Sequence, residues 1–416
     1  MDKELTMKTR QQIGDMLPDN ALCILFAGEA PYRSKDQQYP FSINRNFYYA
    51  TGLDREQMIL LINKQNGKVT QTLFIERPDP LVEKWTGIRL RPEEAQAKSG
   101  IEQVLFVDTF DNHLTRLLLN GLFEHLYLDL EQPNFNAPPS KAHRFSSEMS
   151  AKYPYLSIHN IYPFLGNLRT VKANYELEQI RKAISITKAG IENIFATARP
   201  GMMEYELESE FNHALKTRGV KEHDFSTIMA GGKRATILHY VENDHKIEDG
   251  ELVLADLGAG WNYYSADITR TFPVSGKFTE RQRTIYEIVL KAQAETIDAI
   301  RPGITLAELN NVTKSVFARE LKAINLISKD EEVVEYYYHS VSHPLGLDTH
   351  DVGDNTKPIR PGYVITVEPG LYIAEESIGI RIEDDVLVIE NGCENLSKGI
   401  IKTVEEIESF MAEHRK

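Results

Sequence analysis

Cysteine, positive charge and long apolar runs are all scarce in this sequence. Two cysteines, Cys23 and Cys393, occur in 416 residues, which excludes a disulfide framework and a CxxC metal site and favours a reducing compartment. A membrane-spanning helix needs about 18 consecutive apolar residues, and no stretch of this sequence approaches that length. The charged segment 1–17 also lacks the apolar core of a signal peptide. We therefore expect a cytoplasmic protein that has no membrane partner.

The deficit of positive charge disfavours negatively charged partners. Lysine and arginine number 47 against 61 aspartate and glutamate residues, for a formal net charge of −14. A surface of this sign repels nucleic-acid backbones and anionic membranes, so neither is expected as the main partner. The hydrophobic share of 42% and the charged share of 26% are ordinary for globular proteins, and 416 residues are enough for two or three domains.

The first 168 residues have the pattern of an α/β domain. Apolar segments of strand composition alternate with short helical segments, as in sheets that are covered by helices. The predicted strands are 21–29, 57–64, 70–76, 104–110 and 124–131, and the predicted helices are 3–16, 92–100 and 113–122. We expect one domain over residues 1–168.

Residues 169–416, the second predicted domain, contain a faint internal repeat. The segment RPGMMEYEL at 199–207 shares five of nine positions with RPGITLAEL at 301–309. Each copy follows an amphipathic helical pattern and precedes one pair of acidic residues. Two interpretations are open: a duplicated helix-and-hairpin unit about a pseudo-twofold axis, or two helical segments that share a Pro-Gly stop. We favour the duplication.

The two acidic pairs are the most informative feature of this domain. Asp256 and Asp267 flank one predicted hairpin, and Glu368 and Glu383 flank another. A hairpin centred at the midpoint of each pair would place its two carboxylates directly opposite each other. Directly opposed side chains lie about 4.5–5.5 Å apart at Cβ, where like charges are destabilising. Two such pairs in one domain indicate that cations lie between the carboxylates.

Histidine is also scarce, with 12 residues, yet four of these lie close to the acidic pairs in the sequence. His239 precedes the first pair, and His339, His343 and His350 precede the second. Carboxylates with one or two imidazoles are suitable ligands for divalent transition metals. Two such ions about 3.5–4 Å apart can share a water whose pKa falls from 15.7 to about 7, which makes it a nucleophile. Singly, each residue has a structural alternative, such as a turn cap, a surface ion pair or, for His339, a buried core position.

Six segments, in this order along the chain, resemble metallopeptidases of the pita-bread fold, specifically aminopeptidase P and its relative prolidase. They are ILHYVEN (237–243), LADLGAG (254–260), YSADITRTFPVSGKF (264–278), SHPLGLDTHDVG (342–353), VEPGLYI (367–373) and GIRIEDDVLV (379–388). The resemblance implies an α/β N-terminal domain and an α+β pita-bread catalytic domain with pseudo-twofold internal duplication.

The same resemblance implies that five residues bind two divalent metal ions, with manganese as the expected metal. The five are Asp256, Asp267, His343, Glu368 and Glu383. Asp267 and Glu383 would bridge the ions, and His343 would supply the imidazole. Because all five are present, the chain differs from the metal-free creatinases and from relatives that lack ligands.

Further roles follow from the resemblance. His239 and His350 match histidines that contact the scissile carbonyl and stabilise the tetrahedral intermediate. His339 matches a residue that helps to move protons, and Glu368 matches a ligand that is also a general acid and base. Arg381 resembles an arginine that orients an acidic ligand.

The implied activity is hydrolysis of the N-terminal Xaa-Pro bond of peptides, through a metal-bridging hydroxide, by a homodimer or homotetramer. Three alternatives remain. A prolidase would cut only Xaa-Pro dipeptides, and Pro344 after the histidine ligand is more typical of prolidase. A methionine aminopeptidase shares the five ligands but usually lacks a comparable N-terminal domain. A non-catalytic peptide-binding relative would show no metal-dependent turnover.

Overall fold

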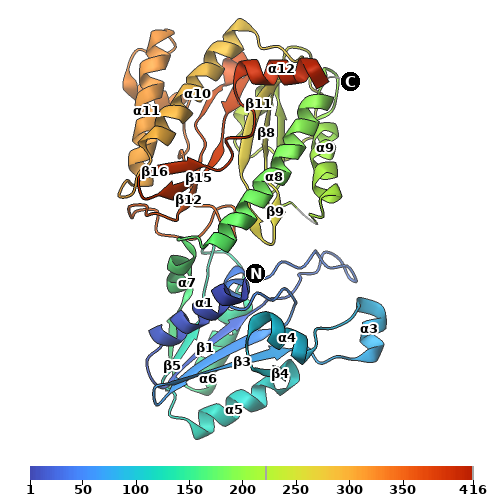
Figure 1. Ribbon diagram of the computed structural model, residues 1–416, viewed down its shortest axis with the longest axis vertical. Coiled ribbons are helices and arrows are strands. Elements are labelled where there is room, and N and C mark those ends of the chain that lie inside the picture. Colours follow the sequence, from blue (N-terminus) through green and yellow to red (C-terminus); the bar gives the residue numbers. More distant parts are fainter. Residues whose placement is uncertain (221–222, 415–416) are drawn as a thin grey trace. The chain divides into compact units, whose positions relative to one another are not determined.

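The computed structural model describes residues 1–220 and 223–414. The chain divides into two compact units, Met1–Leu168 and Arg169–Lys416 (Figure 1). Among the described helices, none combines the length and the apolar character needed to span a membrane.

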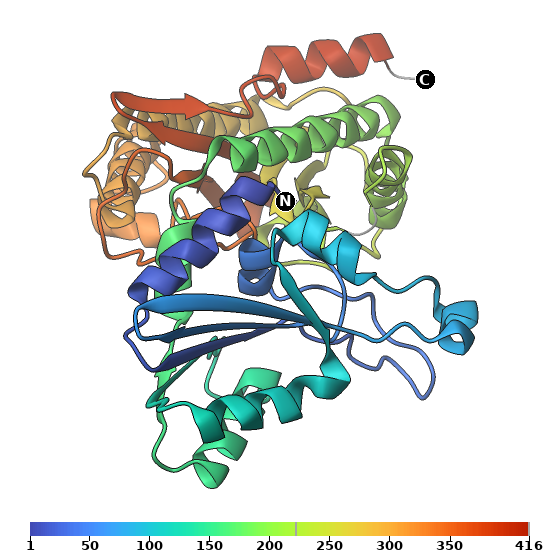
Figure 2. The ribbon, with the colours of Figure 1, turned by 60° about the horizontal axis from the view of Figure 1, so that its bottom comes forward.

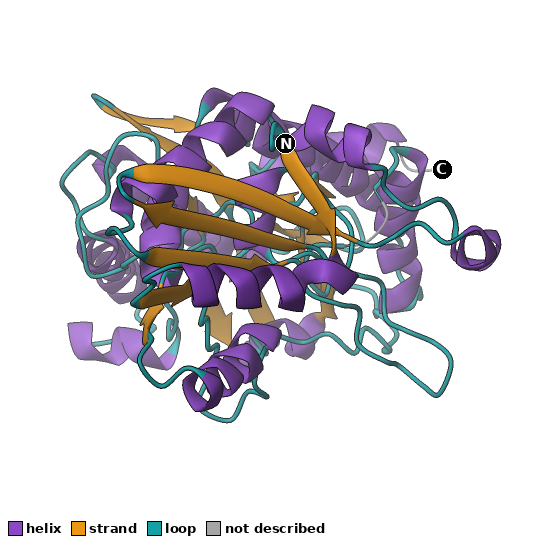
Figure 3. Cartoon of the chain, turned by 90° about the horizontal axis from the view of Figure 1, so that it is seen from below, coloured by secondary structure: helices purple, strands orange, loops and turns teal. Residues whose placement is uncertain are grey.

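The Met1–Leu168 unit is built on one six-stranded sheet of order β4-β3-β2-β1-β5-β6, whose strands lie side by side in Figure 3. The strands are β1 (Ala21–Phe26), β2 (Ile59–Gln65), β3 (Lys68–Ile75), β4 (Gln103–Phe106), β5 (His125–Leu128) and β6 (Ser157–Asn160). Strand β2 is antiparallel to β1 and β3, and the other three pairs are parallel. Every side chain of β1 is buried, as expected for a central strand that is covered on both faces.

Helices cover both faces of this sheet (Figure 2). On one face, α5 (Phe110–Asn120) and α6 (Lys141–Lys152) share a core with β1 and β2, and α1 (Lys3–Met16) and α4 (Pro92–Ser99) lie on the other. The remaining helices are α2 (Arg45–Thr51), α3 (Pro80–Thr86) and α7 (Tyr162–Arg169). The predicted strands and helices are present, with bounds that differ by up to four residues. The prediction of a strand over 104–110 is wrong in its second half, where Val107–Thr109 is a 3-10 helix and Phe110 begins α5. The elements β6, α2, α3, α6 and α7 are not predicted from the sequence.

The Arg169–Lys416 unit contains two helix pairs that flank its strands (Figure 1). The pairs are α8 (Asn174–Thr197) with α9 (Glu204–Thr217), and α10 (Glu280–Ala299) with α11 (Leu306–Ala323); α12 (Val404–His414) comes last. Two sheets have the orders β11-β8-β7 and β12-β15-β16, and β9–β10 and β13–β14 form short ladders. The strands are β7 (Ile228–Gly231), β8 (Leu252–Leu257), β9 (Gly260–Trp261), β10 (Tyr264–Ser265), β11 (Ile268–Pro273), β12 (Val364–Val367), β13 (Gly370–Ile373), β14 (Ile378–Arg381), β15 (Asp384–Ile389) and β16 (Gly392–Asn395).

The two copies of the sequence repeat have the same backbone structure. Each copy is the turn between the helices of one pair, and its glycine has a left-handed φ, +90° at Gly201 and +92° at Gly303. Two reciprocal backbone hydrogen bonds of 2.8 Å join the first turn to Ile247, and two of 2.9 and 2.8 Å join the second turn to Ile359. A Pro-Gly stop alone does not require a matching partner segment, so these bonds favour the duplication.

The first acidic hairpin turns one residue later than the sequence analysis predicts. Asp256 lies opposite Thr269, not opposite Asp267, because the turn is centred between Asn262 and Tyr263. Both turn residues have positive φ, +52° and +67°, which is the type I′ geometry that matches the twist of a two-residue hairpin. Since side chains alternate with a period of two, Asp256 and Asp267 still share one face, as diagonal neighbours.

The second acidic hairpin has the predicted register. The β12–β15 and β13–β14 ladders share one register, which places Glu368 opposite Glu383 in the gap between them. Pro369 lies in this gap and has no N–H to donate to a ladder. The two glutamates are therefore held from both sides by paired strands.

Candidate active site

The four acidic side chains are largely removed from solvent. Asp256, Asp267 and Glu383 are 9%, 5% and 2% exposed, and the side chain of Glu368 is 17% exposed. Asp256 and Glu368 occupy equivalent positions of the two repeats, each nine residues after the isoleucine that binds the Pro-Gly turn. The duplication therefore brings one carboxylate from each half of the unit to the same place.

His343 lies against these carboxylates. Its Nε2 is 3.4 Å from Asp267 Oδ2 and 3.5 Å from Glu368 Oε1, and potential ligand atoms of Asp267, His343 and Glu383 lie within 4.8 Å of one another. His343 Nδ1 lies 3.0 Å from the carbonyl oxygen of Pro344, which can only accept, so we assign the proton to Nδ1. The lone pair of Nε2 then faces the carboxylates. Burial lowers the pKa of His343 to about 4, which keeps the ring neutral near pH 7.

Burial and mutual repulsion disfavour ionisation of Asp267, Glu368 and Glu383. Burial, together with the neighbouring acids, raises the pKa of Asp267 and of Glu383 well above their usual values. Burial raises the pKa of Glu368 to about 8, although Arg381 acts in the opposite direction. Asp256 Oδ1 and Glu383 Oε1 are buried and accept no hydrogen bond from the described residues. Oxygen ligands of this kind beside one imidazole nitrogen suit divalent cations, so the residues present fit a metal site.

Arg381 links the two hairpins. Its Nη2 donates to Asp256 Oδ2 at 2.5 Å, and its Nε donates to Thr269 Oγ1 at 3.1 Å. The Thr269 hydroxyl in turn donates to Glu383 Oε2 at 2.7 Å. Arg381 thus holds one carboxylate directly and another through a hydroxyl. The sequence analysis missed Thr269, which is separated from Arg381 by 112 positions, and no local pattern identifies it.

Tyr372 determines the tautomer of His339. A guanidinium can only donate, so the Tyr372 hydroxyl accepts from Arg381 Nη1 at 3.0 Å and donates its own proton to His339 Nε2 at 2.8 Å. His339 Nδ1–H then donates to the Ser340 carbonyl at 2.9 Å. Burial, with Arg381 nearby, lowers the pKa of His339 to about 4. Tyr372 is a second residue that the sequence analysis missed as a contact, although it lies in the segment VEPGLYI.

The two remaining histidines are exposed at this site. The ring centroids of His343 and His350 are 4.1 Å apart. After the larger effect of burial, the nearby His239 lowers the pKa of His350 and contributes to lowering that of His339. The structure therefore brings together all nine residues singled out from the sequence. Exposed imidazoles beside buried carboxylates can donate hydrogen bonds to the carbonyl of a bound peptide.

A buried ion cluster holds the loop that carries His343 and His350. Asp351 accepts from Arg169 Nη2 at 2.5 Å and from Lys172 Nζ at 2.8 Å, and all three side chains are at most 2% exposed. Burial opposes ionisation of Asp351, but Lys172 and Arg169 nonetheless lower its pKa below the usual value. This carboxylate is therefore structural, and it fixes the residue next to His350.

Two duplicated helix-and-hairpin halves around a buried group of carboxylates and one imidazole define a pita-bread metallopeptidase. A model of the family described as metallopeptidase family M24 matches residues 178–390, and a model of the aminopeptidase P N-terminal domain matches residues 6–124. The chain belongs to metallopeptidase family M24. The fold class, the family and the enzyme class, a metallo-exopeptidase, are those predicted from the sequence.

Several relatives match this chain over nearly its full length. The Xaa-Pro aminopeptidase of Escherichia coli is 34% identical over 98% of each chain, and human Xaa-Pro aminopeptidase 3 is 30% identical over 99% of this chain and 84% of its own. A Bacillus anthracis protein provisionally assigned as an aminopeptidase P is 49% identical, with a TM-score of 0.98 over 100% of this chain and 99% of its own. E. coli aminopeptidase P with the inhibitor Pro-Leu is 32% identical, with a TM-score of 0.91 and the same coverage.

Proposed function

We propose that this protein is an Xaa-Pro aminopeptidase, which hydrolyses the bond between the first residue of a peptide and a proline that follows it. One observation carries the proposal. Five potential ligands from both halves of the duplicated unit gather in one buried cluster, in which two carboxylate oxygens have no hydrogen-bond partner among the described residues. The full-length similarity to Xaa-Pro aminopeptidases gives the substrate class.

In this proposal the cluster holds two divalent cations, with manganese as the metal. Asp256, Asp267, His343, Glu368 and Glu383 would hold the ions. When bound, the ions supply a nucleophile derived from water at neutral pH and polarise the scissile carbonyl. A metal content below two ions per chain in fully active protein would contradict this assignment.

The other site residues act on the substrate and on its protons. His239 and His350 donate hydrogen bonds to the oxygen of the scissile carbonyl, where negative charge develops. Glu368 passes a proton to the proline nitrogen as that nitrogen leaves. His339, whose Nδ1 lies 3.9 Å from Glu368 Oε2, would help to move protons near this carboxyl, and Arg381 keeps Asp256 oriented.

The chemistry of proline explains why a dedicated site is needed. An Xaa-Pro bond is a tertiary amide without an N–H, and the proline ring fixes its own φ, so enzymes that bind an extended chain through that N–H cannot recognise it. Pro-Leu, the inhibitor in one E. coli structure, has a proline followed by a further residue, as the product of a longer peptide would. This supports an aminopeptidase over a prolidase.

Substrate length separates these two activities. We expect Xaa-Pro-Yaa-Zaa tetrapeptides to be hydrolysed at least about tenfold faster, in kcat/KM, than Xaa-Pro dipeptides, a difference of about 1.4 kcal/mol in transition-state binding. Met-Pro peptides should also be better substrates than Met-Ala peptides. Chromatography of the products measures both ratios. Turnover confined to dipeptides would establish a prolidase, and a preference for Met-Ala would establish a methionine aminopeptidase.

Removal of metal should make stability depend on pH in a defined direction. In metal-free protein the Glu368 carboxyl has a pKa of about 8, against about 4.3 when unfolded. The folded state therefore binds the proton more tightly, and the free energy of unfolding should fall as pH rises from about 5 to about 8, by up to about 1.4 kcal/mol per pH unit for one group. Addition of Mn²⁺ at pH 8 should raise the melting temperature.

Thermal unfolding with and without a chelator, across this pH range, tests the expectation. The variant Glu368→Gln cannot ionise, so its metal-free stability should fall less steeply. Glu375→Gln, at the exposed tip of the same hairpin, is the matched control and should keep the wild-type slope. An equal slope in Glu368→Gln and wild type would contradict the role given to this carboxyl.

We further infer a cytoplasmic homo-oligomer, either a dimer or a tetramer. Both cysteines are free, which suits a reducing compartment. Leu81, Trp85 and Ile88, on or next to α3, are 69%, 90% and 79% exposed, and apolar side chains exposed together are typical of a protein contact. Sedimentation velocity would test the oligomeric state, and a monomer at micromolar concentration would contradict it.

A further inference from the structure

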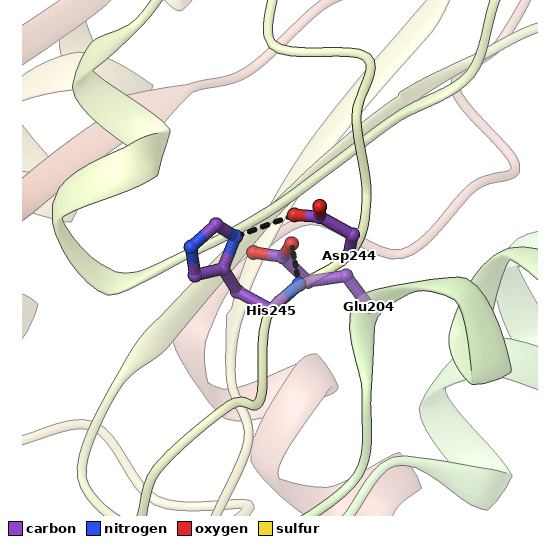
Figure 4. A group of neighbouring side chains, drawn as sticks. All are labelled: Glu204, Asp244 and His245. Carbon is purple, nitrogen blue, oxygen red and sulfur yellow. Dashed lines mark hydrogen bonds and ion pairs between the residues drawn. The ribbon is translucent and has the colours of Figure 1, made fainter.

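A second group of potential ligands, Glu204, Asp244 and His245, lies outside the cluster described above (Figure 4). Glu204 is fully buried, at 0% exposed, whereas Asp244 and His245 are exposed. Figure 4 shows the imidazole beside the Asp244 carboxylate, and the Glu204 carboxylate against the backbone N–H of His245. Glu204 could either bind a cation or accept hydrogen bonds from other residues of the protein.

The hydrogen bonds of Glu204 answer this question. Its Oε1 accepts from the Gly231 N–H at 2.8 Å and from Arg234 Nε at 2.7 Å. Its Oε2 accepts from the Tyr240 hydroxyl at 2.7 Å and from the His245 N–H at 3.0 Å. Four donors use the four lone-pair directions of one carboxylate, so no position is left for a cation. The group carries no metal site.

All four donors belong to the segment 231–245, which leads from β7 toward β8 and carries His239. The segment contains one short 3-10 helix, Gly232–Thr236, and Tyr240, the residue after His239, is buried at its centre. His239 itself is exposed, and its ring makes no hydrogen bond to the residues that the structure describes. The position of this imidazole is therefore set by the backbone around it. Glu204 holds this backbone at Gly231, at Tyr240 and at His245.

We propose that Glu204 is a positioning residue for His239. From the first turn of α9, this one buried carboxylate fixes the segment 231–245 and so places the His239 imidazole over the substrate carbonyl. The inference rests on the proposed function for what His239 does, but the anchoring itself is a property of the fold. A displacement of a catalytic group by about 1 Å can reduce the rate by about 10²-fold, so a rigid anchor for an exposed histidine has a large effect on turnover.

The first experiment compares Glu204→Gln with Glu206→Gln. Glutamine has the same shape as glutamate, but its amide nitrogen donates hydrogen bonds and cannot accept them. In Glu204→Gln this nitrogen would face two of the four groups that donate to Glu204. We expect kcat to fall about 10- to 100-fold with KM changed less than about threefold, because the substrate carbonyl loses its donor in the transition state. The Glu206 side chain is exposed on the same helical turn, and among the described residues it accepts a hydrogen bond from the Met203 N–H alone. Its variant should retain activity within about twofold.

The second experiment asks whether Glu204 acts through His239. If it does, Glu204→Gln should cause no further loss of kcat in a His239→Ala background, since the group that it positions is gone. Tyr240→Phe keeps the buried ring and removes one donor, so it provides a milder variant if Glu204→Gln folds poorly, and it should also be without effect in His239→Ala. Multiplicative losses in both double variants would overturn the proposal and leave Glu204 a general structural residue.

Hydrogen exchange provides a readout that does not depend on the activity. In Glu204→Gln, amides of 231–245 should exchange at least about tenfold faster, while those of α9 beyond its first turn should keep their wild-type rates. Unchanged exchange in 231–245 would overturn the anchoring. If wild-type protein loaded with Mn²⁺ fails to cleave Xaa-Pro peptides, the proposed function fails, and the exchange result still decides whether Glu204 holds this segment.

Discussion

The variant Glu368→Ala is expected to lose Xaa-Pro hydrolysis while keeping its fold, with kcat reduced at least about 10²–10⁴-fold. Alanine removes the general acid and base, which alone contributes about that factor, and it also removes a metal ligand. The fold should persist because, without metal, the Glu368 carboxylate does not stabilise the folded state. Burial raises its pKa to about 8, and the nearby Asp256 contributes to this rise. His343→Ala should likewise lose its metal and its activity.

Three measurements on each variant test this prediction: kcat on an Xaa-Pro tetrapeptide, bound metal by elemental analysis, and the melting temperature of metal-free protein. Glu375→Ala, at the exposed tip of the same hairpin, is the matched control and should behave as wild type. Near-wild-type activity together with a full complement of metal in Glu368→Ala or His343→Ala would show that the ligand assignment is wrong.

The variant Asp351→Asn is expected to destabilise the Arg169–Lys416 unit by about 3–5 kcal/mol. Asp351 forms buried ion pairs with Arg169 and Lys172. Its neutral replacement leaves these two positive side chains buried without the negative charge of Asp351. Asp348, which also pairs with Arg169, has a side chain that is 40% exposed and can compensate only in part. Activity should fall as well, because the residue next to His350 loses its anchor.

Each unit has its own tryptophan, so denaturation of one can be followed separately. Trp261 lies on β9 and Trp85 on α3, so urea unfolding of a Trp85→Phe protein reports on the catalytic unit alone. Asp354, three residues after Asp351, has an exposed carboxylate that pairs with Lys357 and accepts hydrogen bonds from Thr356. The variant Asp354→Asn should therefore cost no more than about 1 kcal/mol. If Asp351→Asn and Asp354→Asn unfold at the same urea concentration, the structural role of the buried ion cluster is contradicted.

Local patterns were sufficient for much of the fold. The amphipathic pattern before each copy of the repeat predicted a helix, and the structure has α8 (Asn174–Thr197) and α10 (Glu280–Ala299) at these two places. These helices could be predicted because apolar spacing along one segment decides which face is buried. Strand β6, with 4 residues, and helix α2, with 7 residues, are too short to show a clear period, and α6 buries just Ala142 and Met149. Their structure depends on the core that they join.

The hairpins show where local reasoning ends. The midpoint rule gave the correct register for Glu368 and Glu383, whose ladders continue on both sides. It failed by one residue at the turn between Asp256 and Asp267, because the positive φ values of Asn262 and Tyr263 moved the centre of the turn. The alternation of side chains kept both carboxylates on one face despite this error, so the predicted site survived the wrong register.

Residue type and spacing alone were enough to indicate a cation site, since four paired acids and a group of histidines are unfavourable without bound charge. Only the tertiary structure decided which groups meet. Arg381 binds Asp256 from the other hairpin, Asp351 binds Arg169 and Lys172 from the start of the unit, and Glu204 gathers a segment that begins 27 positions away. These contacts depend on burial and on hydrogen-bond geometry between distant segments, which no periodicity along one segment encodes.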